Sequence, residues 1–121
     1  MKKTILLVLA VVTVICQFSC SNDEPDVDLQ ELDFDIKNLE NFEYSLGFFG
    51  DEQGARISEQ AKYFEISELE DDVNREIIYT YKSEIGFTGV DFVEIEFVSF
   101  DVSTGLLPVE KKLKITFNIS D

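Results

Sequence analysis

Cys20 follows a segment that has the features of a secretory signal peptide. Two lysines come directly after Met1, and Ile5 to Cys16 form an apolar run of twelve residues that a single threonine interrupts. A helix needs about 20 apolar residues to span the hydrocarbon core of a bilayer, so this run is too short for a transmembrane segment. Its length, its flanks and the small Ser19 predict a signal peptide over residues 1–19, with cleavage before Cys20.

The residues that end at Cys20 resemble the lipobox of bacterial lipoproteins. In Gln17-Phe18-Ser19-Cys20 the last residue occupies the position of the cysteine that these proteins acylate on its thiol, and that becomes the mature N-terminus. The resemblance implies lipidation of Cys20, attachment to the membrane through that residue, and an outer-membrane location. The alternative is an ordinary secreted protein that keeps a free thiol.

An acidic segment follows the cysteine. It holds seven carboxylates: Asp23, Glu24, Asp26, Asp28, Glu31, Asp33 and Asp35. With Pro25 and little apolar content at its start, the segment predicts that residues 20–30 are the lipidated cysteine and an extended, solvated tether. A short acidic stretch after a lipidated cysteine also resembles the surface-export signal of some outer-membrane lipoproteins, which implies exposure at the cell surface. A plain spacer with incidental charge is the alternative.

The charge of the chain excludes one class of partner. Without residues 1–19, which carry two lysines, 102 residues remain with eight basic and 25 acidic side chains, a formal net charge of −17. Such a charge repels nucleic acid and anionic lipid headgroups, so no nucleic-acid partner is expected. The length suits one domain with its own core, and with Cys16 removed and Cys20 acylated no disulfide is expected.

The residue types present argue against an enzyme. The chain has no histidine, which excludes serine, cysteine and zinc mechanisms built on imidazole, and we expect no cofactor. Glu94 and Glu96 project from one face of a predicted strand at a separation of about 6–7 Å, close to that of paired glycosidase carboxylates. A solvent-facing sheet explains both. Asp71-Asp72 is more typical of a turn than of a calcium site, so no metal site is expected.

Alternation with a period of two predicts the fold of residues 31–121. The expected strands are Leu32–Ile36, Phe42–Phe48, Tyr63–Leu69, Arg75–Lys82, Gly89–Phe100 and Leu113–Ile119, separated by turn residues such as Asp71–Asn74. Several short strands with regular turns in about 90 residues favour an all-β fold, an antiparallel immunoglobulin-like sandwich of about seven strands. Residues 51–62 are left open, because a helical turn is compatible with Arg56 to Lys62.

The C-terminal half resembles bacterial cadherin-like and immunoglobulin-like domains. Tyr79-Thr80-Tyr81 is followed by Gly86-Phe87-Thr88-Gly89-Val90-Asp91 and by the alternating strand Phe92 to Val98, a pattern that with Leu113 to Ile119 covers about 40 residues. The resemblance implies a sandwich used for adhesion, spacing or ligand contact. In physical terms, Phe87 can fold back to cap the core edge, and Asp91 can accept hydrogen bonds from nearby turn amides.

An apolar cluster lies in the connection that precedes the last strand. Leu106, Leu107, Pro108 and Val109 either pack down to close one end of the sandwich or form an exposed contact for a partner. We expect a non-enzymatic surface lipoprotein that serves in adhesion or accessory binding of an unidentified protein or glycan. The alternatives are an enzyme inhibitor that uses Thr104 to Val109 as its wedge, and a glycan-binding accessory lipoprotein.

Overall fold

The computed structural model describes residues 27–121, which form seven strands and no helix. The strands are β1 (Asp28–Lys37), β2 (Phe42–Phe48), β3 (Gln53–Glu59), β4 (Phe64–Asp71), β5 (Glu76–Ser83), β6 (Gly89–Ser99) and β7 (Val109–Ser120). The predicted all-β class is confirmed. Among these residues nothing has the length and apolar character of a membrane-crossing helix. The predicted signal peptide and Cys20 lie outside the described residues.

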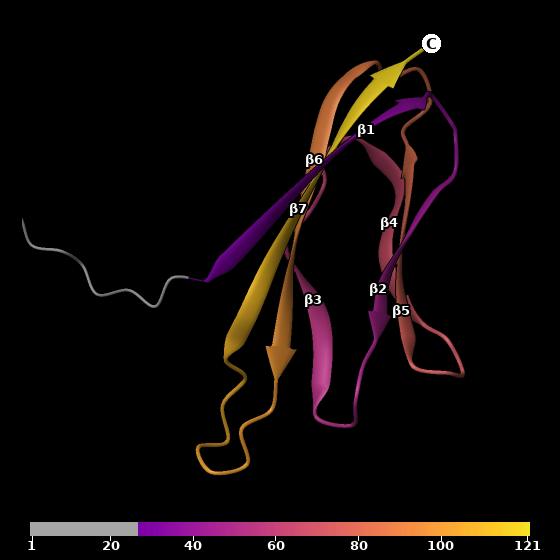
Figure 1. Cartoon of the computed structure of the whole chain (residues 1–121). Coiled ribbons are helices and arrows are strands. Elements are labelled where there is room, and N and C mark those ends of the chain that lie inside the picture. Colours follow the sequence, from indigo (N-terminus) through magenta and orange to yellow (C-terminus); the bar gives the residue numbers. More distant parts are fainter. Residues whose placement is uncertain (1–26) are drawn as a thin grey trace, which may run out of the picture.

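Two sheets pack face to face as a sandwich (Figure 1). One sheet has the order β1-β7-β6-β3 and the other the order β2-β5-β4. In both sheets the neighbours are antiparallel, except that β1 lies parallel to β7. The neighbours β2-β5-β4 and β7-β6-β3 reproduce the B-E-D and G-F-C orders of the immunoglobulin fold. The first strand is therefore an added edge strand of the larger sheet.

The core lies between the sheets and follows the predicted alternation. Leu113, Ile115, Phe117 and Ile119 of β7 are all buried, as are Val93 and Ile95 of β6 and both tyrosines of β5. The rings of Tyr81 and Phe117 stack across the two sheets, with their centroids 4.0 Å apart and an interplanar angle of 8°. The period of two therefore identifies the inward face of these strands correctly.

Residues 53–59 form strand β3, so the helical turn considered for Arg56 to Lys62 is wrong. Ala55 and Ile57 pack against the core, and Arg56 points outward to an ion pair with Glu96 of β6. The local propensity of this short segment does not determine its conformation. Cross-strand pairing at the sheet edge does.

Strand β1 begins at Asp28, three residues before the predicted domain boundary, so residues 28–30 belong to the sheet and not to the tether. In the parallel register Asp28 lies opposite Lys111, and Glu31 lies opposite Lys114. Opposite charges on neighbouring strands favour pairing at these positions. An acidic composition therefore does not distinguish a solvated tether from an edge strand that faces lysines.

Asp91 locks the start of β6 to the segment that precedes β4, in the role predicted for it. It is 2% exposed, and its carboxylate accepts hydrogen bonds from the backbone N–H groups of Lys62 (2.9 Å) and Tyr63 (3.0 Å) and from the Tyr81 hydroxyl (2.8 Å). Phe87 stacks on the ring of Tyr63 with centroids 4.3 Å apart, and so covers the core edge as expected.

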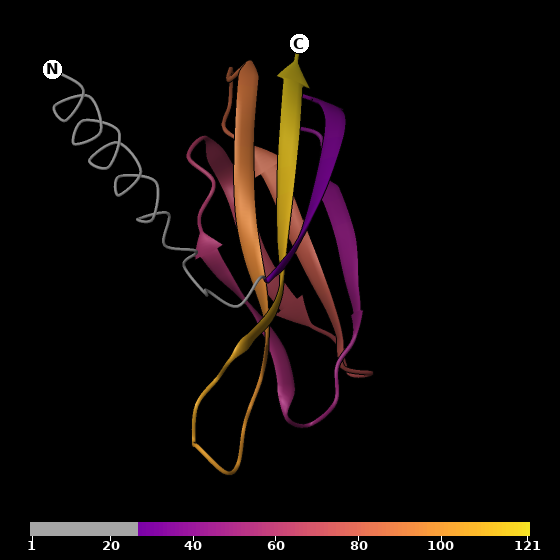
Figure 2. The same cartoon turned by 60° about the vertical axis from the view of Figure 1, so that its left-hand side comes forward.

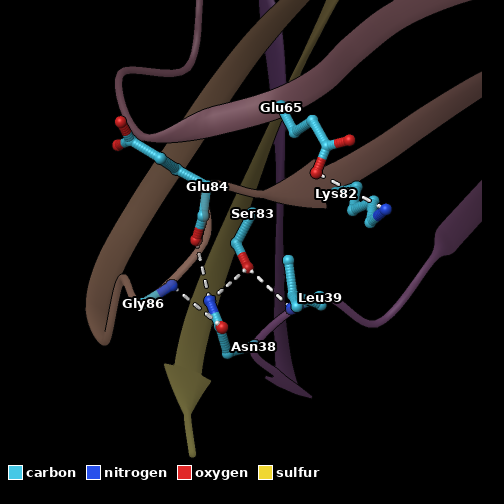
Figure 3. A network of polar contacts seen from close by, with 7 residues as sticks. All are labelled: Asn38, Leu39, Glu65, Lys82, Ser83, Glu84 and Gly86. Atoms are coloured by element: carbon cyan, nitrogen blue, oxygen red, sulfur yellow. Dashed lines mark hydrogen bonds and ion pairs between the residues drawn. The ribbon is translucent and has the colours of Figure 1, made fainter.

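The end of the sandwich at which β7 finishes is held by Asn38 (Figure 3). Its side-chain amide donates to Ser83 Oγ (3.1 Å) and to the carbonyls of Glu84 (2.8 Å) and Phe87 (3.0 Å), and its oxygen accepts from Gly86 N (3.1 Å). These bonds fasten the β1–β2 turn to the β5–β6 loop. We call this the clasp end of the domain.

Candidate functional site

Three connections meet at the end of the sandwich opposite the clasp end (Figure 1). The backbone N–H of Phe100 donates to the carbonyl of Glu52 (2.6 Å), which joins the β6–β7 loop to the β2–β3 loop. Phe49 N donates to the carbonyl of Arg75 (3.1 Å), and the Arg75 guanidinium pairs with Asp51, which joins the β2–β3 loop to the β4–β5 turn. We name this surface, residues 48–52, 72–75 and 100–108, the loop end.

The β6–β7 loop is an ordered turn. Asp101 forms a bridge with Leu106, and its carbonyl accepts a hydrogen bond from Gly105 N (2.7 Å). The Asp101 carboxylate accepts from Ser103 N (2.9 Å) and Ser103 Oγ (2.6 Å), which lowers its pKa below the ordinary 3.8. Gly105 has a φ of 69°, a left-handed conformation that glycine adopts without steric cost. The loop therefore presents its side chains on a defined backbone.

The two leucines predicted as a contact or as a core closure are exposed. Leu106 is 64% and Leu107 49% exposed, and Pro108 is exposed as well. Val109 is half-buried as the first residue of β7. The core closes without Leu106 and Leu107, so the interpretation that they seal one end of the sandwich is wrong.

Four further apolar side chains on the loop end were not singled out from the sequence. They are Phe48, 72% exposed, Val73, 98% exposed, Phe100, 42% exposed, and Val102, 70% exposed. The alternation through β2 predicted an inward Phe48, but a bulge between Ser45 and Gly47 shifts the register and turns Phe48 outward. Single apolar residues in turns carry no periodic signal, which is why the other three were missed.

A hollow of about 440 Å³ lies beside these loops, where the open edges of the two sheets separate. Phe49, Leu69 and Ile77 supply its apolar wall, and Asp51, Asp71 and Arg75 its charges. The ring of Phe49 stacks on Phe97 with centroids 5.6 Å apart. Phe97 is half-buried and packs against the core, and a register shift between Phe97 and Val98 places Val98 in a buried position as well. Asp51 and Arg75 pair with one another across this hollow, which adds a concave surface beside the loop end.

Glu94 and Glu96 lie on the outer face of β6, where the sequence placed them. The Glu96 carboxylate pairs with the guanidinium of Arg56 (2.8 Å) and lies 3.9 Å from the Lys112 ammonium. Glu96 is therefore engaged in ion pairs on the outer face of the sheet. Asp72 accepts hydrogen bonds from Asn74 N and Glu76 N, as a turn residue does. Within residues 27–121 no cluster of three metal-ligating side chains occurs.

Comparisons with known proteins support the fold. Scans of protein-family models and of curated proteins give no match. Among solved structures the chain is similar to an endo-fucoidan hydrolase from glycoside hydrolase family 107, with a TM-score of 0.52 and 9% sequence identity over 77% of this chain. The matched region is 13% of that protein, so this chain spans a small part of its length. At this identity the likeness shows the β-sandwich alone.

Proposed function

We propose that the chain is a lipid-anchored surface protein whose immunoglobulin-like domain works by contact, with the loop end as its contact surface. The observation that carries the proposal is the concentration of exposed apolar side chains there. Of the eleven large apolar side chains exposed by residues 27–121, six lie on the loop end: Phe48, Val73, Phe100, Val102, Leu106 and Leu107. Apolar side chains gathered on one face of a domain are typical of an interaction site.

The loop end suits contact better than chemistry. Its charged groups Asp51 and Arg75 are paired, and Asp101 is bonded to its own turn. The hydrogen bonds between the three connections hold the apolar side chains on a rigid support, which lowers the entropy lost on docking. The domain therefore fits adhesion or accessory binding, in which affinity comes from buried area.

Protection of an introduced thiol tests whether the loop end is in contact on cells. Residues 27–121 contain no cysteine, so Leu106→Cys adds a single thiol to the domain. We expect a maleimide reagent to label it at least about fivefold more slowly on intact cells than after solubilisation in detergent. Ile85→Cys, at a 78% exposed position on the clasp end, is the matched control and should label at the same rate in both states. Equal labelling of both variants in both states would contradict a contact at the loop end.

The anchor has its own test. Cys20→Ser should abolish metabolic labelling with palmitate and release the protein into the soluble fraction, because the acyl chains are the proposed attachment. Stable attachment takes more than one chain, since a single myristoyl chain binds a bilayer only marginally. Membrane retention of Cys20→Ser would remove the basis for the anchor.

A further inference from the structure

We propose that the loop end lies against the bilayer in which Cys20 is anchored, so that the loop end is the membrane-facing pole of the domain. This inference rests on the proposed lipidation of Cys20 and names the surface that the loop end meets.

The chain joins the sandwich away from the clasp end, part-way along the domain toward the loop end. Asp28, the first residue of β1, pairs with Lys111, two residues after β7 leaves the β6–β7 loop. In Figures 1 and 2 the start of β1 lies toward the end that carries this loop, whereas the C-terminus lies at the other end. The parallel pairing of β1 with β7 is the cause, because an antiparallel β1 would begin at the clasp end.

The length of chain between Cys20 and Asp28 favours one end of the domain for contact with the bilayer. Eight residues reach at most about 28 Å. Leu106 in the β6–β7 loop lies at most about 17 Å beyond the level of Asp28, because it is five residues before Lys111. The clasp end lies in the opposite direction from Asp28, at the far end of β1. At the rise of a strand this distance is about 30 Å. Contact of Leu106 with the bilayer therefore needs less than the full reach of the segment between Cys20 and Asp28, whereas contact of the clasp end would need all of it.

The side chains of the loop end define the kind of lipid surface. Its six exposed apolar side chains gain free energy by entering the headgroup region. Its carboxylates, Asp51, Glu52, Asp72 and Asp101, face a single cation, Arg75, which pairs with Asp51. A zwitterionic surface suits this composition and an anionic one repels it. With one basic residue, which is already paired, the contact is weak by itself, and the anchor supplies the high local concentration that makes it persist.

A tryptophan probe tests the orientation, because the chain has no native tryptophan. The acylated full chain carrying Leu106→Trp is placed in phosphatidylcholine vesicles with or without bromine on the acyl chains. Ile85→Trp, on the clasp end, is the matched control. We expect brominated lipid to quench the Leu106→Trp emission at least about twofold and to leave the Ile85→Trp emission unchanged. Phosphatidylglycerol in the vesicles should reduce the quenching.

The other possible results distinguish a wrong orientation from a missing anchor. Flotation of both variants with the vesicles, without selective quenching of Leu106→Trp, overturns the membrane-facing pole and leaves the anchor intact. If the Leu106→Cys thiol is then still protected on cells, the loop end contacts a protein or glycan instead. Failure of the chain to float overturns the anchor, and the orientation falls with it.

Discussion

Asp91 is the only carboxylate among residues 27–121 that is buried. Asp91→Ala would leave the N–H groups of Lys62 and Tyr63 without their acceptor, and the Tyr81 hydroxyl with only the more distant carbonyl of Tyr63 (3.3 Å). A buried donor left unpaired costs about 1–3 kcal/mol, so we expect a loss of at least about 2 kcal/mol in the free energy of unfolding, measured in urea. Glu94→Ala, on the outer face of the same strand, is the control and should change it by less than about 0.5 kcal/mol. A loss below about 1 kcal/mol for Asp91→Ala would contradict the locking role.

Tyr79 and Tyr81 are expected to make the folded state less stable at alkaline pH. Both are fully buried; burial raises the pKa of Tyr79 well above its ordinary 10.0, and burial together with the hydrogen bond to Asp91 raises that of Tyr81. The folded state keeps both phenols protonated, while the unfolded chain releases their protons above about pH 10. The stabilisation is therefore complete below pH 10 and declines above it, by about 1.4 kcal/mol per pH unit for each tyrosine. Urea unfolding between pH 9 and 11 measures how the free energy of unfolding falls with pH. Tyr81→Phe should remove the contribution of one tyrosine and so make this fall shallower.

At the residue scale, the sequence predicted those roles of side chains that depend on their local position in a strand or beside a turn. The acceptor role of Asp91 and the solvent-facing position of Glu96 follow from their places beside a turn and on an alternating strand. The partners were not predictable, because Arg56 meets Glu96 and Lys62 meets Asp91 only after strands distant in sequence come together.

At the scale of elements, the clasp end depends on one side chain. Asn38→Ala removes four hydrogen bonds, one to Ser83 at the end of β5 and three to the β5–β6 loop. We expect it to lower the free energy of unfolding by about 2–6 kcal/mol, at about 0.5–1.5 kcal/mol for each bond. Glu84→Ala is the matched control, because Asn38 uses only the backbone carbonyl of Glu84 and the Glu84 side chain points away from the network (Figure 3). Equal losses for the two variants would show that Asn38 has no special part.

Elements that bury one face were predictable and edge segments were not. The pattern located β7 because Leu113, Ile115, Phe117 and Ile119 form an uninterrupted alternation. Strand β3 was ambiguous, since Ala55 and Ile57 are its only apolar residues that pack on the core. A bulge in β2 turned Phe48 outward, whereas Phe97 packs against the core beside the register shift in β6. Periodicity contains no signal for an inserted residue.

At the scale of the whole molecule, the class of fold followed from the sequence and the arrangement of its poles did not. Six strand candidates separated by turns are enough to predict a sandwich. The parallel pairing of β1 with β7 depends on a register that alternation leaves undetermined, and it is this pairing that brings the start of the domain to the loop end. The grouping of Leu106 and Leu107 with Phe48 and Val73 likewise needs three loops to meet.

The same pairing determines how the domain bears mechanical load. A pull between the N-terminal end of β1 and the C-terminal end of β7 draws the two strands in opposite directions along their common axis. Ten residue pairs join these strands, from Asp28 with Lys111 to Lys37 with Ser120. The force then acts in shear, so the hydrogen bonds of the pair share it and do not open one after another. Tension between the two ends of the chain would therefore act along a resistant direction of the sandwich.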